Sequence, residues 1–323
     1  MKRSDLTRLP LQLYQRMLFA IQIWLFKKIT QSSNAWLVFD KAGLPGFGTK
    51  LLRLYFPVYY AEDSHRDSFS LIVKQKISNL LSAHTTPDPF EEKIITAITG
   101  VLRFPIKEQD LGTPYLDNHY FGVFDAAVLS VMMETFKPGK ILEIGSGIST
   151  RYMKSFRDQL DLQTELVCID PAPRVEIRSS IDKLILKPLE QAIDEGSFAL
   201  EKGDFVFMDG SHYIFQGNDT LTFFFKLLPS LPSGVIIHIH DIYLPFDYPQ
   251  NVAQQLWTEQ YILAAMIESG LTNYQVLYPA DYKSKTSPKI AAALAKVNDQ
   301  LTDQNFEIIK THDAGFSFWM IKK

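Results

Sequence analysis

The chain has 323 residues and a net charge of −3, with 46% hydrophobic and 21% charged residues. These values are ordinary for a soluble globular protein, and they exclude the strongly basic surface that general nucleic-acid binding requires. The length allows one large domain, or one domain with an appendage. The single cysteine, Cys168, excludes an intrachain disulfide and fits a cytoplasmic location. Its apolar neighbours predict a buried side chain rather than a reactive thiol.

The N-terminal segment combines basic residues with a broad apolar face. Within residues 1–30, six basic residues oppose one acid, and polar side chains recur at three- and four-residue steps through residues 9–26. This spacing predicts an amphipathic helix. Arg16 in its middle disfavours a spanning helix, and the lack of a small-residue cleavage site disfavours a signal peptide. The apolar face would pack on this chain or a second copy, or would lie peripherally at the inner membrane face.

Residues 67–83 and 90–101 are predicted to form two further helices, separated by the breaker "HTTPDP". The stretch "RFPIKEQDLGTP" that follows is typical of a linker. We therefore predict a helical region at residues 1–105, without visible chemistry, and a second domain at residues 106–323.

From residue 121 onward, predicted helices and strands alternate. The helices are expected at 121–136, from Ser149, in a short piece before 183, at 219–228 and at 251–270. The strands are expected at 140–145, 165–170, 183–187, 204–210, 235–241, 274–279 and 315–323. This alternation predicts an α/β, doubly wound, seven-stranded sheet that is mostly parallel, with a late antiparallel strand.

Polar signals stand where four of these strands end. Gly145, Asp170, Asp209 and Asp241 end the first, second, fourth and fifth strands, and parallel strands of such sheets bind ligands at that edge. In "ILEIGSGIST", a glycine turn follows the first strand, but Thr150 stands where a dinucleotide site would have its third glycine. The lysine of a phosphate-binding loop is also missing. The pattern favours an adenosine ligand without phosphates, whose ribose hydroxyls would bind Asp170.

The stretches "ILEIGSGIST" and "VCIDPAPR" resemble motif I and the ribose-binding acid of class I S-adenosylmethionine-dependent methyltransferases. A narrower resemblance, to a bacterial branch allied to the methyltransferase-24 group, runs through "NHYFGVFDA", "FMDGSH", "LPSGVIIHIHDIYLPFDYP", "WTEQYIL" and "GFSFWM". The match covers about residues 112–323. It implies a Rossmann-like fold and S-adenosyl-L-methionine as the cofactor, and says little about the substrate.

The resemblance also implies roles for individual residues. Segment 188–192 would flank the adenine, and Tyr120 would belong to a lid together with Asn118. The expected cofactor-binding set is Glu143, Gly145, Ser146 and Gly147 at the methionine end, Asp170 at the ribose, and Asp209 and Asn118.

The candidate catalytic residues follow the fourth and fifth strands. They are Asp209, His212, His240 and Asp241, which could accept the proton of a hydroxyl that takes the methyl group. Since residues two apart share a face of a strand, His238 and His240 would point one way and Asp241 the other, unless the strand has ended. His238 lies deeper and is expected to be structural.

The same strand ends could hold a divalent metal. Asp209 and Asp241 match the positions of the carboxylates in catechol-type O-methyltransferases, which use the ion to orient and acidify a hydroxyl. Ile242 stands where those enzymes have a carboxamide, which argues against an identical site. Imidazole ligands from His212 or His240 would shift the preference from magnesium to a transition metal.

Aromatic and acidic residues after the fifth strand could line an acceptor site, or could simply pack in the core. They are Tyr243, Phe246, Asp247, Tyr248, Trp257, Glu259 and Tyr261. Aromatic side chains suit a small planar molecule or a sugar, so we predict O-methylation of a small-molecule or glycan hydroxyl. The alternative is a non-catalytic scaffold that docks through residues 9–26. A nicotinamide-dependent oxidoreductase is disfavoured by Thr150, and no nucleic-acid partner is indicated.

Overall fold

The computed structural model describes residues 69–173, 175–249, 252, 255–302 and 314–323. All of them belong to one compact unit that spans Ala61–Lys323. The predicted amphipathic helix at residues 9–26 lies outside the described residues, so its membrane and oligomer contacts stay predictions. Among the described residues, no helix is both long enough and apolar enough to cross a membrane.

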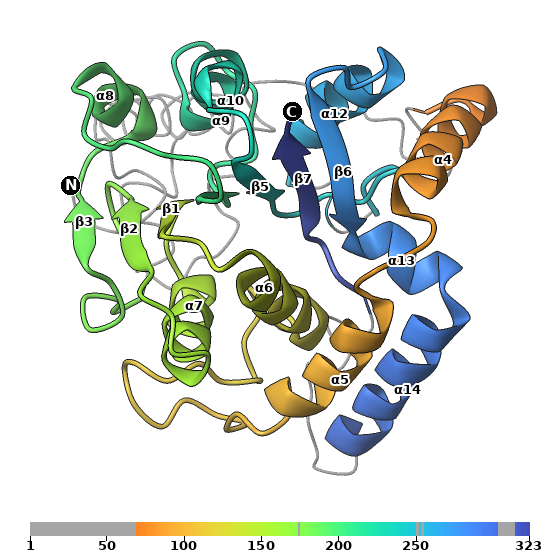
Figure 1. The fold of residues 1–323 in the computed structure, drawn as a ribbon, viewed down its shortest axis with the longest axis horizontal. Helices are drawn as coiled ribbons and strands as arrows, with labels where there is room; N and C mark the ends of the chain where they lie inside the picture. Colours follow the sequence, from red (N-terminus) through yellow and green to blue (C-terminus); the bar gives the residue numbers. More distant parts are fainter. Residues whose placement is uncertain (1–68, 174, 250–251, 253–254, 303–313) are drawn as a thin grey trace, which may run out of the picture. The chain divides into compact units, whose positions relative to one another are not determined.

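A seven-stranded sheet in the order β3-β2-β1-β4-β5-β7-β6 forms the centre of this unit (Figure 1). Its strands are β1 (Lys140–Ile144), β2 (Glu165–Ile169), β3 (Lys183–Ile185), β4 (Phe205–Met208), β5 (Ile236–Ile239), β6 (Tyr274–Pro279) and β7 (Phe318–Lys322). The pairs from β3 to β5 are parallel, and β7 runs antiparallel to both β5 and β6. The predicted fold class, including the late antiparallel strand, is confirmed.

Helices cover both faces of the sheet (Figure 1). One layer contains α5 (Glu91–Val101), α6 (Val123–Phe136), α7 (Ile148–Gln159) and α14 (Pro288–Thr302). The other contains α4 (Leu71–Thr85), α8 (Leu189–Asp194), α9 (Asp219–Thr222), the π-helical segment η2 (Phe223–Leu227), α10 (Leu228–Ser230) and α12 (Glu259–Glu268). Helix α13 (Ala280–Thr286) links β6 to α14.

The strands are apolar without alternation because both faces are buried. In β4, Phe205 and Phe207 join the hydrophobic cluster of the first layer, while Val206 and Met208 join that of the second. Burial on both faces is typical of parallel strands in doubly wound sheets. The core therefore holds the strand ends, and the side chains just beyond them, in fixed positions.

Two predicted helices differ from the structure. The described residues between 171 and 182 form turns rather than a helical piece, because Pro171 and Pro173 lack the N–H groups that a helix needs. The helix expected at 251–270 is interrupted at residues 255–258: Val252 is helical and α12 begins at Glu259, because Leu256 has a left-handed backbone with φ of 64°.

Helices α13 and α14 occupy a stretch where our sequence analysis expected neither a helix nor a strand. The signal for α14 is its stripe of buried side chains at three- and four-residue spacing, namely Ile290, Leu294, Val297 and Leu301. This stripe packs in the same hydrophobic cluster as α5 and α6.

Helices α4 and α5 confirm the two predicted helical segments before residue 105. Lys283 of α13 donates to the carbonyl of Thr85, and Phe90, next to α5, packs against Tyr278 of β6. Both helices contribute buried residues to the clusters that cover the sheet. The domain boundary near residue 105 stays a prediction.

Candidate functional site

The glycine turn after β1 is pressed against the end of β4. Gly145 has φ of +79°, and its N–H donates to the carbonyl of Ile169 at 3.0 Å. A Cβ atom at this position would lie 1.9 Å from the carbonyl oxygen of Asp209. The N–H of Asp209 donates to the carbonyl of Ile144 at 2.9 Å. This hydrogen bond holds the backbone of Asp209, so its carbonyl oxygen cannot easily move away from residue 145. Glycine is therefore required at residue 145 by both backbone conformation and space.

Asp170 fixes the same turn from the neighbouring strand. Its Oδ2 accepts hydrogen bonds from the N–H of Ser146 at 2.9 Å and from the Ser146 hydroxyl at 2.7 Å. Its Oδ1 accepts from the N–H of Ala172 at 2.7 Å. A carboxylate offers about four acceptor positions, so capacity for a ligand hydroxyl remains. The structure thus places the predicted ribose-binding acid directly beside the predicted methionine-binding turn.

Glu143 lies beneath the turn, in a buried hydrogen-bond network. Its carboxylate accepts from the hydroxyls of Ser149 and Thr150 and from the thiol of Cys168. The Thr150 hydroxyl also accepts from the N–H of Gly147 at 3.0 Å, which caps the start of α7. Thr150, which stands in the place of the third glycine, therefore caps α7 and binds Glu143. Glu143 in turn holds the first residues of α7 next to the turn. Cys168 is buried, as predicted.

Burial raises the pKa of Glu143 to about 7 from an ordinary value of 4.5, although its hydrogen bonds oppose the rise. The stability from this raised pKa is fully present below pH 4.5 and is lost as the pH rises through 7. We therefore expect the free energy of unfolding of Glu143→Gln, relative to that of the wild type, to rise by about 3 kcal/mol from acidic to alkaline pH. Urea unfolding of both proteins from pH 5 to pH 8 measures this change.

A matched control for this experiment is Glu165→Gln, because the Glu165 side chain is 46% exposed and pairs with Lys140 at 3.3 Å. It should keep the wild-type dependence of unfolding free energy on pH. An unchanged pH dependence in Glu143→Gln would show that the buried carboxyl does not titrate in this range.

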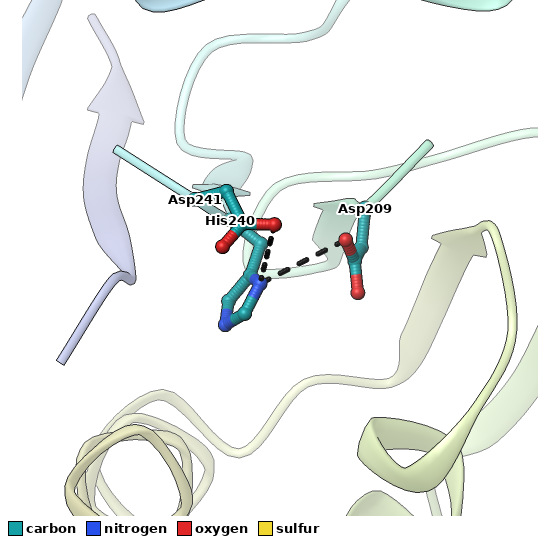
Figure 2. Close-up of side chains that lie close together, drawn as sticks. All are labelled: Asp209, His240 and Asp241. Carbon is teal, nitrogen blue, oxygen red and sulfur yellow. Dashed lines mark ion pairs between the residues drawn. The ribbon is translucent and has the colours of Figure 1, made fainter. Parts of the chain in front are cut away.

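The second part of the site lies beyond β4 and β5. Four predicted catalytic residues converge there, and we call them the His–Asp cluster: Asp209, His212, His240 and Asp241. Figure 2 shows three of them, with His240 between the two carboxylates. Because β5 ends at Ile239, the alternation of a strand does not apply to the next two residues. Asp241 has φ of 57°, and its Oδ2 lies 3.6 Å from Nδ1 of His240.

His212 is held by the start of α12. Its Nδ1 is hydrogen-bonded to Oε1 of Glu259, and its carbonyl accepts the N–H groups of Thr258 and Glu259. Its Nε2 lies 3.5 Å from Oδ1 of Asp209 and 3.4 Å from Oδ2 of Asp241. Burial lowers the pKa of His212, but the carboxylate of Glu259 and then those of the His–Asp cluster raise it to about 9.

His240 is held from the opposite layer of helices. Its Nδ1 lies 3.7 Å from Oδ1 of Asp209, and its Nε2 lies 3.7 Å from Oδ2 of Asp125 in α6. Asp125 is fully buried and accepts the backbone N–H groups of Phe316 and Ser317. Burial lowers the pKa of His240, and the surrounding carboxylates, with that of Asp241 first, raise it well above its usual value.

Asp125 was missed by our sequence analysis, and Glu259 was assigned only to the acceptor site. The signal for Asp125 was a carboxylate inside an otherwise apolar helix. His238 is buried in the core as predicted, stacked on Phe207 and bonded through Nε2 to the hydroxyl of Ser317 at 2.9 Å.

Asn118 organises the turn before α6. Its Oδ1 accepts the N–H groups of Tyr120 and Phe121, and its Nδ2 donates to the carbonyl of Tyr115. The Tyr120 side chain is exposed. The predicted lid residues therefore include one that holds the loop and one that faces solvent.

The predicted aromatic residues gather beside His212. The Trp257 ring lies 4.3 Å from its imidazole, and Tyr248 packs edge-on against both Trp257 and Tyr261. The hydroxyl of Tyr261 donates to Asp247 at 2.7 Å. Trp257 thus connects these rings to the His–Asp cluster, and their role as an acceptor site stays a prediction.

Residues 142–242 match the family model of the methyltransferase-24 group, which describes a methyltransferase domain. This span contains the glycine turn, Asp170 and the whole His–Asp cluster. The strand order around this span is the doubly wound sheet that the resemblance implied.

Solved structures similar to this chain, all at low identity, include two that are described as methyltransferases. A cmcI structure with Mg and SAM is 16% identical, covers 46% of this chain and has a TM-score of 0.33. The plantazolicin methyltransferase BpumL in complex with SAH is 18% identical, with 78% of this chain and 98% of that chain covered and a TM-score of 0.36. SAH-bound PaMTH1 from Podospora anserina is 15% identical, with 79% and 97% covered and a TM-score of 0.37.

The match spans 62% of the cmcI chain, which is less than two thirds of its length. A comparison with curated proteins gives no match.

Proposed function

We propose that this chain is an S-adenosylmethionine-dependent methyltransferase that methylates a hydroxyl group of a small molecule or a glycan. The observation that carries the proposal is the position of Asp170 and the glycine turn next to the His–Asp cluster at one edge of the sheet. One part suits a nucleoside with an amino-acid tail, and the other suits a hydroxyl that must lose a proton.

The residues of the turn fit this cofactor. Only glycine can occupy residue 145, because an added Cβ would collide with the carbonyl oxygen of Asp209. Asp170 retains acceptor capacity for a ribose hydroxyl after its three internal hydrogen bonds. The turn carries no lysine for phosphate groups. These features support an adenosyl ligand without phosphates over a dinucleotide.

The cofactor supplies a methyl group that its sulfonium has already activated for displacement. The chain must align the acceptor with that methyl group, which can lower a barrier by about 7–11 kcal/mol. The His–Asp cluster would receive the proton that the acceptor hydroxyl releases when the cofactor's methyl group is transferred to its oxygen. A positioned base adds about 10²–10⁴-fold, so alignment contributes more than proton transfer.

The His–Asp cluster could also hold a divalent ion, since Asp209, His240 and Asp241 offer ligand atoms within 4.8 Å of one another. When bound, such an ion would acidify the acceptor hydroxyl and orient it. Both roles place the acceptor oxygen at the same strand ends.

Two measurements test the proposed function. In parallel calorimetric titrations of the full chain, S-adenosylhomocysteine should bind and NAD should not. In a screen of catechols, sugars and glycans, tritium from the labelled methyl group should reach an acceptor oxygen, with acceptors whose hydroxyls are already methylated as matched controls. Binding of NAD alone, or label on nitrogen alone, would contradict the proposal.

A further inference from the structure

A buried guanidinium lies in the first turn of α7. The side chain of Arg151 is 1% exposed, and a charged side chain is rarely buried to this extent unless it is paired. Its Nη1 donates to Oε1 of Glu108 at 2.6 Å, and its Nη2 donates to the carbonyl of Glu176 at 3.3 Å. Its Nε has no hydrogen-bond partner among the described residues, so the two terminal nitrogens hold the side chain.

The two partners of Arg151 belong to different segments of the chain. Glu108 lies in the segment between α5 and α6, and Glu176 lies in the segment between β2 and β3. The two segments are also neighbours, since a Cβ atom added at Gly112 would lie 3.5 Å from the hydroxyl oxygen of Ser179. Arg151 therefore joins two segments that are far apart in the sequence to the same helix.

Both segments lead to residues of the predicted cofactor site. The first contains Asn118, whose Nδ2 donates to the carbonyl of Tyr115 at 2.6 Å, and that carbonyl also accepts the hydroxyl of Tyr152 in α7 at 3.5 Å. The second segment follows directly on Asp170. Two consecutive residues of α7 thus hold the segment of Asn118, and the first of them also holds the segment that leaves Asp170.

The same turn of helix is bonded to the glycine turn. Thr150, next to Arg151, accepts the N–H of Gly147 at 3.0 Å and donates to the buried carboxylate of Glu143. Three parts of the predicted cofactor site therefore meet at the start of α7, namely the glycine turn and the two segments that Arg151 joins. Their spacing depends on how the guanidinium is held.

The ion pair between Arg151 and Glu108 suits the fixing of an arrangement better than the gain of stability. A buried ion pair is a weak source of stability, because the loss of hydration offsets much of the attraction between the charges. In some proteins such pairs select one arrangement of the chain. A guanidinium has five N–H donors in a fixed plane, so it can hold two segments at a defined separation.

A second arginine of α7 shows the same contacts away from the predicted site. Nη1 of Arg157 donates to Oδ2 of Asp182 at 2.6 Å and to the carbonyl of Thr164 at 3.1 Å. Thr164 and Asp182 directly precede β2 and β3, so this pair lies at the amino ends of the strands. Arg151 makes its contacts at the other end of α7, next to the glycine turn. The two arginines thus differ mainly in what they hold.

We propose that Arg151 is a positioning residue for cofactor binding, because it holds the segment of Asn118 and the segment after Asp170 at a fixed separation on α7. Both segments are then in place before the cofactor arrives, which lowers the entropy lost on binding. Arg151 acts through these segments rather than by contact with the ligand. The inference rests on the proposed function, since it requires an adenosyl ligand at the glycine turn.

The test is calorimetric titration of S-adenosylhomocysteine into the full chain. Arg151→Gln should weaken binding by about ten-fold or more, because ordering the two segments then opposes binding. Arg151→Lys keeps a charge that can pair with Glu108, so it should recover part of the loss. With an acceptor in hand, KM for S-adenosylmethionine should rise by the same factor in Arg151→Gln, while kcat at saturating cofactor stays within about two-fold. Unchanged affinity in Arg151→Gln, or a fall in kcat with unchanged KM, would overturn the inference.

The matched control is Arg157→Gln, which removes an arginine of the same helix with the same kinds of contact. It should lower the free energy of unfolding in urea to a similar extent, but leave the affinity for S-adenosylhomocysteine within about two-fold of the wild type. Without ligand, amide hydrogen exchange should become faster in residues 105–118 and 175–182 of Arg151→Gln, and should stay unchanged there in Arg157→Gln. Equal losses of affinity in the two variants would show that only the stability of α7 matters, and the inference would fall.

A second variant decides the matter if Arg151→Gln fails to fold. Glu108→Ala removes a side chain that is 45% exposed and releases the first segment from α7. It should weaken binding of S-adenosylhomocysteine by about three-fold or more, since one of the two segments is then free. Wild-type affinity in Glu108→Ala would contradict the inference.

Titration of the wild type separates this inference from the proposed function. If the wild type binds no S-adenosylhomocysteine, the proposed function and the role of Arg151 in cofactor binding both fail. If the wild type binds it and Arg151→Gln binds it equally well, only the role of Arg151 fails and the proposed function stands.

Discussion

Replacing Asp170 by alanine should lower the affinity for S-adenosylhomocysteine by about a hundred-fold or more. Hydrogen bonds to a charged group contribute about 1.5–3 kcal/mol each, and a ribose offers two hydroxyls to this carboxylate. Each 1.4 kcal/mol corresponds to a factor of ten in affinity. The variant also loses the two hydrogen bonds from Ser146 that hold the glycine turn. Isothermal titration calorimetry of wild type and variant measures the difference.

Two controls separate direct contact with the ribose from support of the turn. Ser146→Ala removes a hydroxyl that donates to Asp170 and leaves the carboxylate, so it should lose much less affinity. An analogue of the ligand without the ribose 2′-hydroxyl should bind the wild type more weakly, and should bind Asp170→Ala no more weakly than the full ligand. Asp194→Ala, an exposed acid that pairs with Lys226, should match the wild type. Undiminished affinity in Asp170→Ala would remove the basis for the proposed cofactor site.

Replacing Gly145 by alanine should lower the free energy of unfolding by about 3–5 kcal/mol, a loss at the upper end of what a single substitution usually causes. The new Cβ would lie 1.9 Å from the carbonyl oxygen of Asp209, and φ of +79° is unfavourable for any residue with a side chain. Relief of the clash would shift the backbone of Asp209, whose carboxylate belongs to the His–Asp cluster. Urea unfolding measures the stability loss.

The matched control is Gly196→Ala. Gly196 has φ of +63°, but no atom lies within 4 Å of an added Cβ. It isolates the backbone term, which is about 1–2 kcal/mol for a left-handed residue. Equal losses in the two variants would show that the contact with Asp209 is relieved at no cost.

The positions of the candidate site residues could be predicted because a parallel sheet converts sequence order into spatial order. Once the strands were recognised from their apolar runs, Gly145, Asp170, Asp209 and Asp241 had to lie at one edge. The structure confirms that arrangement. Short-range patterns also placed His238 in the core, because it lies inside a strand that is buried on both faces.

The supports of the site could not be predicted in the same way. Asp125 and Glu259 reach the cluster from helices that are far apart in the chain, and no local pattern states which side chain a helix will direct at a strand end. The directions in which the side chains of His240 and Asp241 point depend on where β5 ends. The ends of helices and strands are the least certain part of a sequence-based prediction. Tertiary packing, rather than local preference, decided these positions.

The two imidazoles are braced from opposite sides of the sheet, by Asp125 in α6 and by Glu259 in α12. Neither carboxylate can move far without moving the helix that carries it, and each helix packs in its own hydrophobic cluster. The His–Asp cluster is consequently in contact with both halves of the core. Substitutions that disturb the apolar packing of either half, even far from the polar residues of the cluster, should therefore displace the imidazoles of His212 and His240.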